Sequence, residues 1–333
     1  MAKKYLQHWV LSASCLFCLY TSDAQPANEE IQSGYRGSFN SNIKVVNNAV
    51  NFIAVGDWGR NGEYYQQDVA GQMTRVAATS GTNFIVAVGD NFYPSGVQST
   101  SDPNWHYSFE DIYKGYFLHC NWYVALGNHD YKGNIQAQID YSRISRRWQM
   151  PGTYYSRKIK LPNNDEILLV VMDTNPFIAS YYTKNDELSE NVRQQDTAVQ
   201  RKWLETTLSD TSRIVKWKIV VGHHPMYSGG KRMKSKDTED IRQQFQALFN
   251  KTKVNAYICG HEHDLQIIRP AGQYTTQFLS GAGCEVRPSG STDGTLFWAS
   301  KPGFMTFAVT AQELTVQVVG VDGTVLHTTT LHP

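Results

Sequence analysis

Five stretches of the sequence share one pattern, in which an apolar run ends in a glycine followed by side chains that can bind a metal ion. The apolar runs are typical of buried β-strands, and a glycine allows the backbone to turn sharply. Side chains just past the carboxyl end of a strand face the crevice in which α/β proteins bind ligands. Five repeats therefore indicate one shared site. The stretches are Ile53–Gly59, Val86–Tyr93, Val124–Asp130, Ile219–His224 and Ala256–His263.

These stretches offer too many ligands for one metal ion and about the right number for two. Asp90 lies in the central stretch, and because a carboxylate can bridge two metals, Asp90 is the expected bridge. His261 and His263 lie on one face of an extended segment, where they could serve neighbouring ions. The ligand candidates are Asp57, Asp90, Tyr93, Asn128, His223, His261 and His263, with His129 as a further candidate.

Tyr93 indicates the kind of metal. A free phenol has a pKa of about 10, so binding as a phenolate at neutral or acid pH requires a hard, strongly Lewis-acidic ion. Ferric iron fits this requirement, whereas magnesium and calcium fit poorly. The group formed by Asn128, His223 and His261 suits a divalent transition metal instead.

Two metals about 3.5–4 Å apart form the usual clamp for displacement at phosphorus. His129 follows Asn128 directly and is expected to contact phosphate or to protonate the leaving oxygen, with a purely structural histidine as the alternative. Asp130 is expected to face solvent in a turn, and orientation of His129 is its alternative role. His224 is ambiguous in the same way.

Composition and charge place the chain among ordered globular proteins. It has 333 residues, 41% of them hydrophobic, and a formal net charge of +1, so no global charge favours a nucleic-acid partner. Lys3 and Lys4, the apolar run 9–20 and the small residues at 22–24 predict a cleaved export signal. That run is too short to span a bilayer, and a buried N-terminal helix is the alternative. The remaining cysteines, Cys120, Cys259 and Cys284, indicate no disulfide framework.

Alternating strands and helices must position the ligands. From Ile43 this alternation predicts parallel strands joined by helical crossovers. After Gln273 the pattern becomes purely β, and we expect this part to form or complete a second sheet. The polar segment 175–195 is expected to be a surface loop. The predicted helices cover about 63–79, 102–114, 134–146, 196–208 and 238–249. The predicted domain organisation is a signal peptide (1–24), a flexible extension (25–42) and one catalytic domain (43–333).

The ordered motifs resemble the purple acid phosphatases of the binuclear metallophosphoesterase superfamily, most closely the small tartrate-resistant type. The resemblance runs from about residue 50 to the C-terminus. It implies an α/β four-layer sandwich, in which two mixed β-sheets pack face to face with helices on the outer faces. The motifs are Asp57–Gly59, Gly89–Tyr93, Gly127–Asp130, Val220–His223 and Gly260–His263.

The resemblance also implies roles for single residues. Ferric iron would be bound by Asp57, Tyr93 and His263. A second divalent ion (iron, zinc or manganese) would be bound by Asn128, His223 and His261, with Asp90 bridging the two. His129 would act as the catalytic residue, and Asn128, His129 and His224 would contact substrate. The expected reaction is hydrolysis of phosphate monoesters by a metal-bound hydroxide, often best at acid pH.

Two departures limit this resemblance. Neither 175–195 nor the loop directly after His223 contains cysteine, so the disulfide beside the regulatory loop of the mammalian enzymes has no counterpart. Where some relatives carry an extra histidine, Ser228–Asp237 offers lysines and an arginine. The run Lys231–Lys236 is either a solvated loop or a local attraction for an anionic substrate.

The favoured hypothesis is an exported enzyme, secreted or periplasmic, that acts on small phosphorylated substrates. We expect a monomer without nucleic-acid partner or stable membrane anchor. The alternatives are a phosphodiesterase or nucleotidase on the same metals, and a non-hydrolytic iron redox or binding protein.

Overall fold

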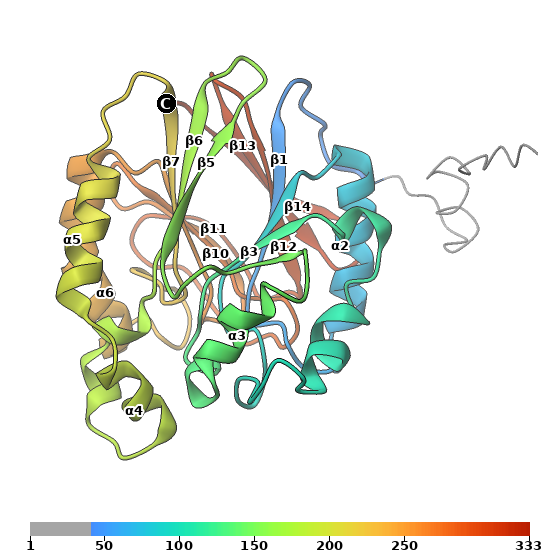
Figure 1. Cartoon of the computed structure of the whole chain (residues 1–333). Helices are drawn as coiled ribbons and strands as arrows, with labels where there is room; N and C mark the ends of the chain where they lie inside the picture. Colours follow the sequence, from blue (N-terminus) through green and yellow to red (C-terminus); the bar gives the residue numbers. More distant parts are fainter. Residues whose placement is uncertain (1–40) are drawn as a thin grey trace, which may run out of the picture. The chain divides into compact units, whose positions relative to one another are not determined.

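The computed structural model describes residues 41–333, which form two β-sheets of seven strands each with helices on their outer sides (Figure 1). The predicted signal peptide and nearly all of the predicted extension lie outside the described residues and stay predictions. Within 41–333, no helix has both the length and the apolar character that crossing a membrane requires. Two mixed sheets with outer helices confirm the predicted fold class.

The first sheet joins the beginning of the described chain to its end. Its strand order is β14-β13-β12-β1-β2-β3-β4, with β1 parallel to β2 and antiparallel to β12. Strands β1 and β2 are buried along their whole length, as parallel strands covered on both faces usually are. The strands are β1 Val50–Val55, β2 Phe84–Ala87, β3 Asn121–Val124, β4 Trp148–Gln149, β12 Gly303–Val309, β13 Leu314–Gly320 and β14 Val325–Leu331.

The second sheet has the order β11-β9-β10-β8-β7-β6-β5, and β6, β7, β8 and β10 run parallel. Phe278 of β10 and Phe307 of β12 contact edge to face, with centroids 5.4 Å apart, and so connect the two sheets through one core. The strands are β5 Tyr155–Lys160, β6 Glu166–Val171, β7 Val215–Val221, β8 Ala256–Cys259, β9 Leu265–Ile268, β10 Thr276–Ser280 and β11 Thr295–Ala299.

Helices cover the outer faces because each has one apolar side. In α6 the buried Ile241, Phe245 and Phe249 recur every four residues and pack toward Tyr257 of β8. Helix α2 lies against the first sheet, on the opposite side of the molecule from α5 and α6 (Figure 1). The helices are α2 Gln66–Ser80, α3 Ile135–Tyr141, α4 Glu187–Arg193, α5 Thr197–Leu208 and α6 Lys236–Thr252.

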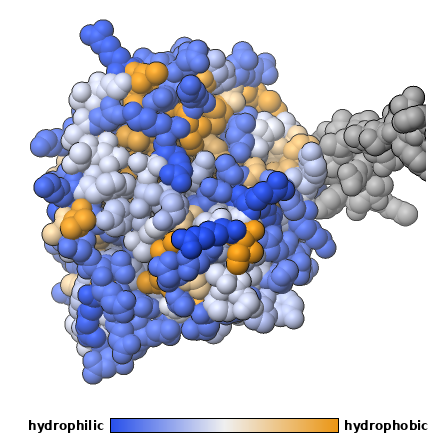
Figure 2. Space-filling view, viewed as in Figure 1, coloured by the Kyte–Doolittle hydropathy of each residue, from blue (hydrophilic) through white to orange (hydrophobic). Residues whose placement is uncertain are grey.

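The surface is largely polar on the face shown in Figure 2, with small apolar areas between hydrophilic ones. Exposed apolar side chains such as Tyr64, Tyr116 and Trp298 come from separate segments of the chain. Scattered exposure of this kind is normal for a globular protein. Cys120, Cys259 and Cys284 form no disulfide within residues 41–333.

The placement of the last strands differs from the prediction. Only β10 and β11 of the C-terminal β-rich part join the second sheet, together with β9, for which no strand was predicted. Strands β12, β13 and β14 pair instead beside β1 in the first sheet. Their pairing covers what would otherwise be an open edge at β1. An alternating apolar pattern predicts a strand but does not specify its partner.

The segment 175–195 is not a simple surface loop, as its charge had suggested. It contains short 3₁₀ turns and the helix α4, and its Ile178, Leu188 and Val192 are buried. The predicted helix at 102–114 is also wrong, because the structure has one π-helical turn at Trp105–Glu110 there. In both places tertiary packing of a few large side chains outweighs local propensity.

Candidate metal centre

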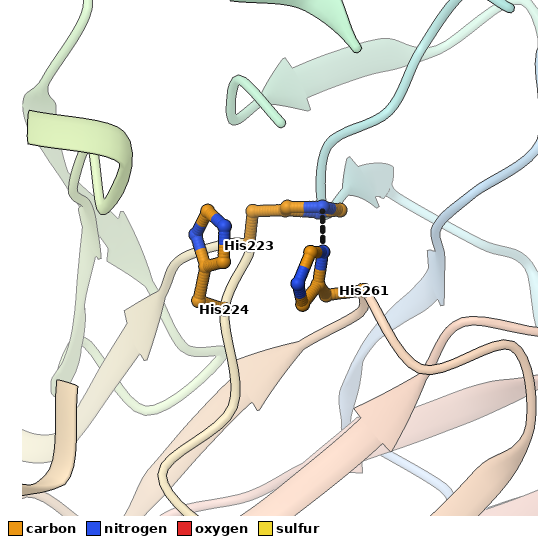
Figure 3. Close-up of side chains that lie close together, drawn as sticks. All are labelled: His223, His224 and His261. Atoms are coloured by element: carbon orange, nitrogen blue, oxygen red, sulfur yellow. Dashed lines mark hydrogen bonds between the residues drawn. The ribbon is translucent and has the colours of Figure 1, made fainter. Parts of the chain in front are cut away.

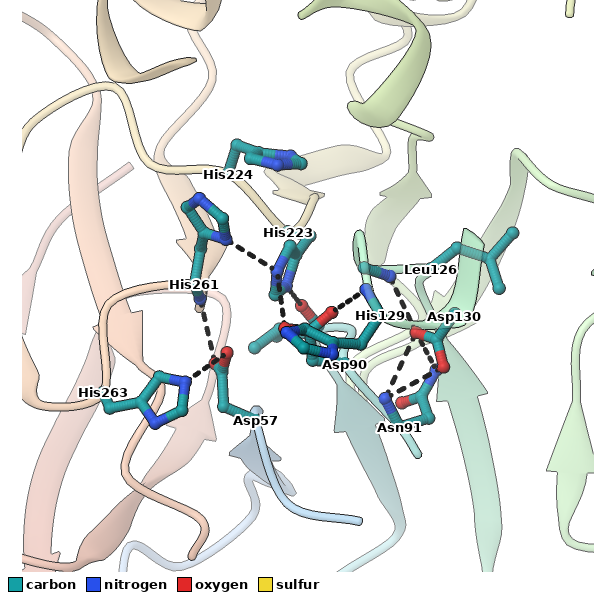
Figure 4. Close-up of polar contacts among 12 residues, drawn as sticks. Asp57, Asp90, Asn91, Leu126, His129, Asp130, His223, His224, His261 and His263 are labelled. Carbon is teal, nitrogen blue, oxygen red and sulfur yellow. Dashed lines mark hydrogen bonds and ion pairs between the residues drawn. The ribbon is translucent and has the colours of Figure 1, made fainter. Parts of the chain in front are cut away.

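Strand ends from both sheets meet where the predicted ligands lie. Asp57, Asp90 and Asn128 follow β1, β2 and β3, which are parallel neighbours in the first sheet. His223 and His261 follow β7 and β8, which are parallel neighbours in the second sheet. Carboxyl ends of parallel strands share one edge of a sheet, and Figure 4 shows side chains from both sheets converging there.

Three of the predicted ligands take a left-handed backbone conformation directly after a glycine. The φ angles are 56° at Asp57, 51° at Asp90 and 71° at His261, a region that residues with a Cβ rarely adopt. Gly89 has a φ of 95°, and a Cβ there would lie 2.6 Å from Nδ1 of His223. The turns that direct these side chains are therefore strained, and such strain concentrates at functional sites.

One side of the site, which we call the tyrosine side, consists of Asp57, Tyr93 and His263. The Tyr93 hydroxyl lies 3.2 Å from Oδ1 of Asp57 and 3.3 Å from Nε2 of His263. Nε2 of His263 is 3.5 Å from the same Asp57 oxygen. All three side chains are buried, so three groups that can each bind an ion share one space away from bulk water.

The other side, which we call the histidine side, consists of Asn128, His223 and His261. Nε2 of His223 and Nδ1 of His261 lie 3.1 Å apart, and both rings are buried (Figure 3). Oδ1 of Asn128 is a buried oxygen without a hydrogen-bond partner among residues 41–333. A buried acceptor ordinarily has a donor or a cation as its partner, so this oxygen is a candidate ligand atom.

Asp90 contacts both sides of the site. Its Oδ2 is 2.9 Å from the Tyr93 hydroxyl and 3.4 Å from Nε2 of His223. Its Oδ1 accepts a hydrogen bond from the backbone N–H of His129 at 2.7 Å. The Asp90 carboxylate is thus within reach of ions on either side.

Hydrogen bonds determine which nitrogen of each histidine on the histidine side carries the proton. Nδ1 of His223 donates to the Val88 carbonyl oxygen at 2.9 Å, and Nε2 of His261 donates to Oδ2 of Asp237 at 2.8 Å. The inner nitrogens, Nε2 of His223 and Nδ1 of His261, face each other across 3.1 Å, and they share either a proton or a metal ion between them. Because both outer nitrogens are held by acceptors, the inner nitrogens can bind an ion in place of that proton, so the donor set fits a metal ion.

Burial opposes ionisation of the acidic groups in the site. It raises the pKa of Asp57 to about 8, with His223 opposing this shift and Asp90 adding to it. Burial also acts to raise the pKa of Asp90, but the neighbouring His223, His129 and His261 together hold that pKa well below its usual value. Burial, followed by Asp57 and Asp90, raises the pKa of Tyr93 well above its usual value. Ionising all three groups together requires added positive charge, which metal ions supply.

His129 lies at the mouth of the site, partly exposed. Its Nδ1 donates to the Pro94 carbonyl oxygen at 2.6 Å, and its ring centroid is 4.4 Å from that of Tyr93. Since a carbonyl oxygen can only accept, Nδ1 carries a proton and Nε2 is the nitrogen available to a substrate. Burial lowers the pKa of His129 below its usual value.

His224 is fully buried behind the histidine side. Its Nδ1 lies 2.8 Å from Oγ1 of Thr174 and its Nε2 lies 2.8 Å from the Tyr181 hydroxyl. Its ring centroid is 4.3 Å from that of His261. Direct contact of His224 with substrate therefore requires that one of these hydroxyl partners be released.

Asp130 corrects an expectation from the sequence, because it is fully buried rather than exposed in a turn. Its carboxylate accepts hydrogen bonds from the backbone N–H groups of Asn91 and Gly127 and from the Gln138 amide. Asp130 thus ties the loop after β2 to the loop after β3, and it does not contact the His129 side chain through any of these bonds. Its role is to position backbone rather than to orient the catalytic candidate.

Two clusters of metal-binding groups have their ligand atoms within 4.8 Å of one another, in the part of the chain that the structure describes. One comprises Asp57, Asp90 and His223, and the other His223, His224 and His261. The structure also assigns a partner to His261 that the sequence did not reveal. That partner, Asp237, is separated from His261 by 24 positions, so no local motif connects them.

A calcineurin-like phosphoesterase family model matches residues 50–265. Purple acid phosphatase 17 of Arabidopsis thaliana is 30% identical over 98% of this chain and 95% of its own. Tartrate-resistant acid phosphatase type 5 of Oryctolagus cuniculus is 36% identical over 72% of this chain and 74% of its own. The chain belongs to the purple acid phosphatases.

Members of the purple acid phosphatases are phosphoric monoester hydrolases with a binuclear metal centre, which confirms the predicted enzyme class. Solved structures show the same fold at lower identity. GAP50, the anchor in the inner membrane complex of Plasmodium, has a TM-score of 0.73 at 23% identity and covers 85% of this chain and 89% of its own. Purple acid phosphatase PPD1 from yellow lupin seeds has a TM-score of 0.60 at 15% identity, over 88% of this chain and 55% of its own.

Proposed function

We propose that this purple acid phosphatase hydrolyses phosphate monoesters at a centre of ferric iron and a divalent metal. The tyrosine side would hold ferric iron and the histidine side iron, zinc or manganese, and Asp90 would serve as a ligand to both. The observation that carries the proposal is the buried cluster in which Asp90 joins the adjacent rings of His223 and His261 to the Tyr93 hydroxyl.

The two sides favour different ions. The pKa of Tyr93 is raised by burial and by two carboxylates, so only a strongly Lewis-acidic ion ionises its phenol. Ferric iron has that strength. The histidine side offers two neutral imidazoles and an amide oxygen, which suit a divalent transition metal. When bound, the two ions activate water and polarise the phosphate ester.

The protein's own residues then orient the ester and move a proton. The Pro94 carbonyl holds Nδ1 of His129 and leaves Nε2 free for the substrate. When the ring is protonated at acid pH, Nε2 gives its proton to the leaving oxygen. Asn128 and His129 contact the phosphate. The His129 backbone N–H also holds Asp90, so the same turn positions both the bridge and the proton donor.

The protein is exported after removal of residues 1–24, is secreted or periplasmic, and acts as a monomer on small phosphorylated substrates. Export is supported by the first residues, in which two lysines are followed by an apolar run. The chain's net charge of +1 gives no support to a nucleic-acid partner. The catalytic domain comprises residues 43–333.

The test combines metal content, the visible spectrum and hydrolysis of p-nitrophenyl phosphate and bis(p-nitrophenyl) phosphate. We expect one iron and one divalent ion per chain, a visible phenolate-to-iron band and preference for the monoester. Tyr93→Phe should abolish the band, while Tyr64→Phe, at an exposed tyrosine, should retain it. A colourless active protein would exclude the iron–tyrosine assignment, and preference for the diester would favour a phosphodiesterase. An inactive protein with both ions bound would overturn the hydrolytic function.

A further inference from the structure

The outer nitrogen of His261 is bound by a carboxylate from a different element. Nε2 of His261 donates to Oδ2 of Asp237 at 2.8 Å, and Asp237 lies in the first turn of α6. His261 is 2% exposed and Asp237 is 7% exposed, so water competes little for this hydrogen bond. A buried charge-assisted bond of this kind is short and strong.

Asp237 is itself held as an ionised acceptor. Nη1 of Arg232 lies 2.9 Å from the same Oδ2, and the Ser235 hydroxyl and the Thr238 backbone N–H donate to Oδ1. The carboxylate therefore accepts the His261 proton rather than offering one.

The basic loop (Lys231–Lys236) is attached to the His261 motif at further points. Nε of Arg232 donates to the His261 carbonyl oxygen at 3.2 Å. Oε2 of Glu262, the residue between the two histidines of the motif, accepts from the Arg232 backbone N–H at 2.8 Å and from the Ser228 hydroxyl at 3.0 Å. The loop thus carries Asp237 to a defined position against His261.

We propose that Asp237 is the positioning residue of the histidine side, and that it sets the affinity of this side for its divalent ion by orienting His261. This inference rests on the proposed function. With the proton on Nε2, the Nδ1 lone pair of His261 faces the metal site, and the carboxylate increases its basicity. Arg232 supports this role by holding Asp237.

The effect is confined to one side of the centre. On the tyrosine side, Nδ1 of His263 has no hydrogen-bond partner among the described residues, and its nearest acid, Glu285, lies 3.7 Å away. The outer nitrogen of His223 donates to a backbone carbonyl, which no side-chain substitution removes. A substitution of Asp237 should therefore change the affinity for the divalent ion and leave the iron site intact.

The test is a zinc titration against a competing chelator, with iron bound, in the full-length protein. We expect Asp237→Asn to weaken zinc binding by about 10–100-fold while the visible band stays unchanged. Excess zinc should restore most of kcat, because Asp237 acts through His261. Glu239→Gln, at an exposed acid on the same helix, is the matched control and should bind zinc as the unaltered protein does.

Arg232→Gln is the second variant, in case Asp237→Asn folds poorly. It keeps the Asp237 carboxylate and removes one of its donors, so we expect up to about a tenfold loss of zinc affinity. If the unaltered protein binds two ions and both variants bind zinc as tightly as the unaltered protein does, the inference is overturned. If the unaltered protein binds no ions, the proposed function itself is wrong. This outcome is distinguishable from one in which the protein binds both ions but the variants keep their zinc affinity.

Discussion

The two sides of the metal centre are held in different ways. On the histidine side each ring has its outer nitrogen bound, His223 to the Val88 carbonyl and His261 to Asp237. On the tyrosine side Nδ1 of His263 lacks such a bond within residues 41–333. There the neighbouring groups are charges instead: Arg60 pairs with Glu285 at 2.8 Å, and its guanidinium carbon lies 4.0 Å from the centre of the Tyr93 ring.

This difference suits two ions of unequal charge. Hydrogen bonds orient neutral imidazoles for a divalent ion, which binds through directed lone pairs. Under the proposed function, a trivalent ion would be held chiefly by the negative charge of Asp57, Asp90 and the Tyr93 phenolate, and nearby cations would modulate that charge. The comparison yields predictions that we order by the size of the expected effect.

Asp90→Ala should have the largest effect, because it removes the group that contacts both sides. We expect loss of both ions and a fall of activity to the level of chelator-treated protein. Metal analysis and p-nitrophenyl phosphate hydrolysis measure this. Asp111→Ala, at an acid whose ion pair with His106 is exposed, should retain both ions. A variant that keeps both ions and full activity would contradict a bridging role.

His129→Ala should lower kcat by about 100-fold while both ions remain bound, because His129 contributes a proton rather than a ligand. The measurement pairs kcat with metal content and the visible band. His119→Ala, at an exposed histidine, is the control and should leave kcat unchanged. Unchanged hydrolysis in His129→Ala would remove this residue from the mechanism and leave the metal assignments intact.

Tyr93→Phe should separate the two sides most clearly. We expect loss of the visible band and weaker iron binding, because the phenolate is removed from the tyrosine side. Zinc affinity on the histidine side should change little, since its rings keep their outer hydrogen bonds. An equal loss of zinc affinity would show that the two sides are not held independently.

Arg60→Gln should have the smallest effect and tests the role of charge on the tyrosine side. A positive charge over the Tyr93 ring stabilises the phenolate electrons, so removing it should shift the charge-transfer band to longer wavelength. Arg60→Lys should shift the band less, and Arg75→Gln, at an exposed arginine on α2, should not shift it. A band that stays in place in Arg60→Gln would exclude this tuning.

The sequence by itself determined the strand ends and the ligand candidates that follow them. Each junction is local, since an apolar run, a glycine and a polar residue such as Asp57, Asp90 or His261 lie within a few positions of one another. Parallel neighbours then bring these junctions to one edge. What the local pattern missed is that the ligands themselves take the left-handed conformation, whereas among the glycines directly before them only Gly89 does.

Only the tertiary structure decided which distant groups support the ligands. Strands β12 to β14 cover β1 rather than completing the second sheet, and Asp130 is buried because β2 and β3 bring two loops together around it. Asp237 reaches His261 from the first turn of a helix that begins beyond the basic loop. Periodicity and spacing describe neighbours along the chain, whereas these contacts arise only when separate elements pack. Packing favours contacts that give buried polar groups hydrogen-bond partners, and such partners can come from any part of the chain.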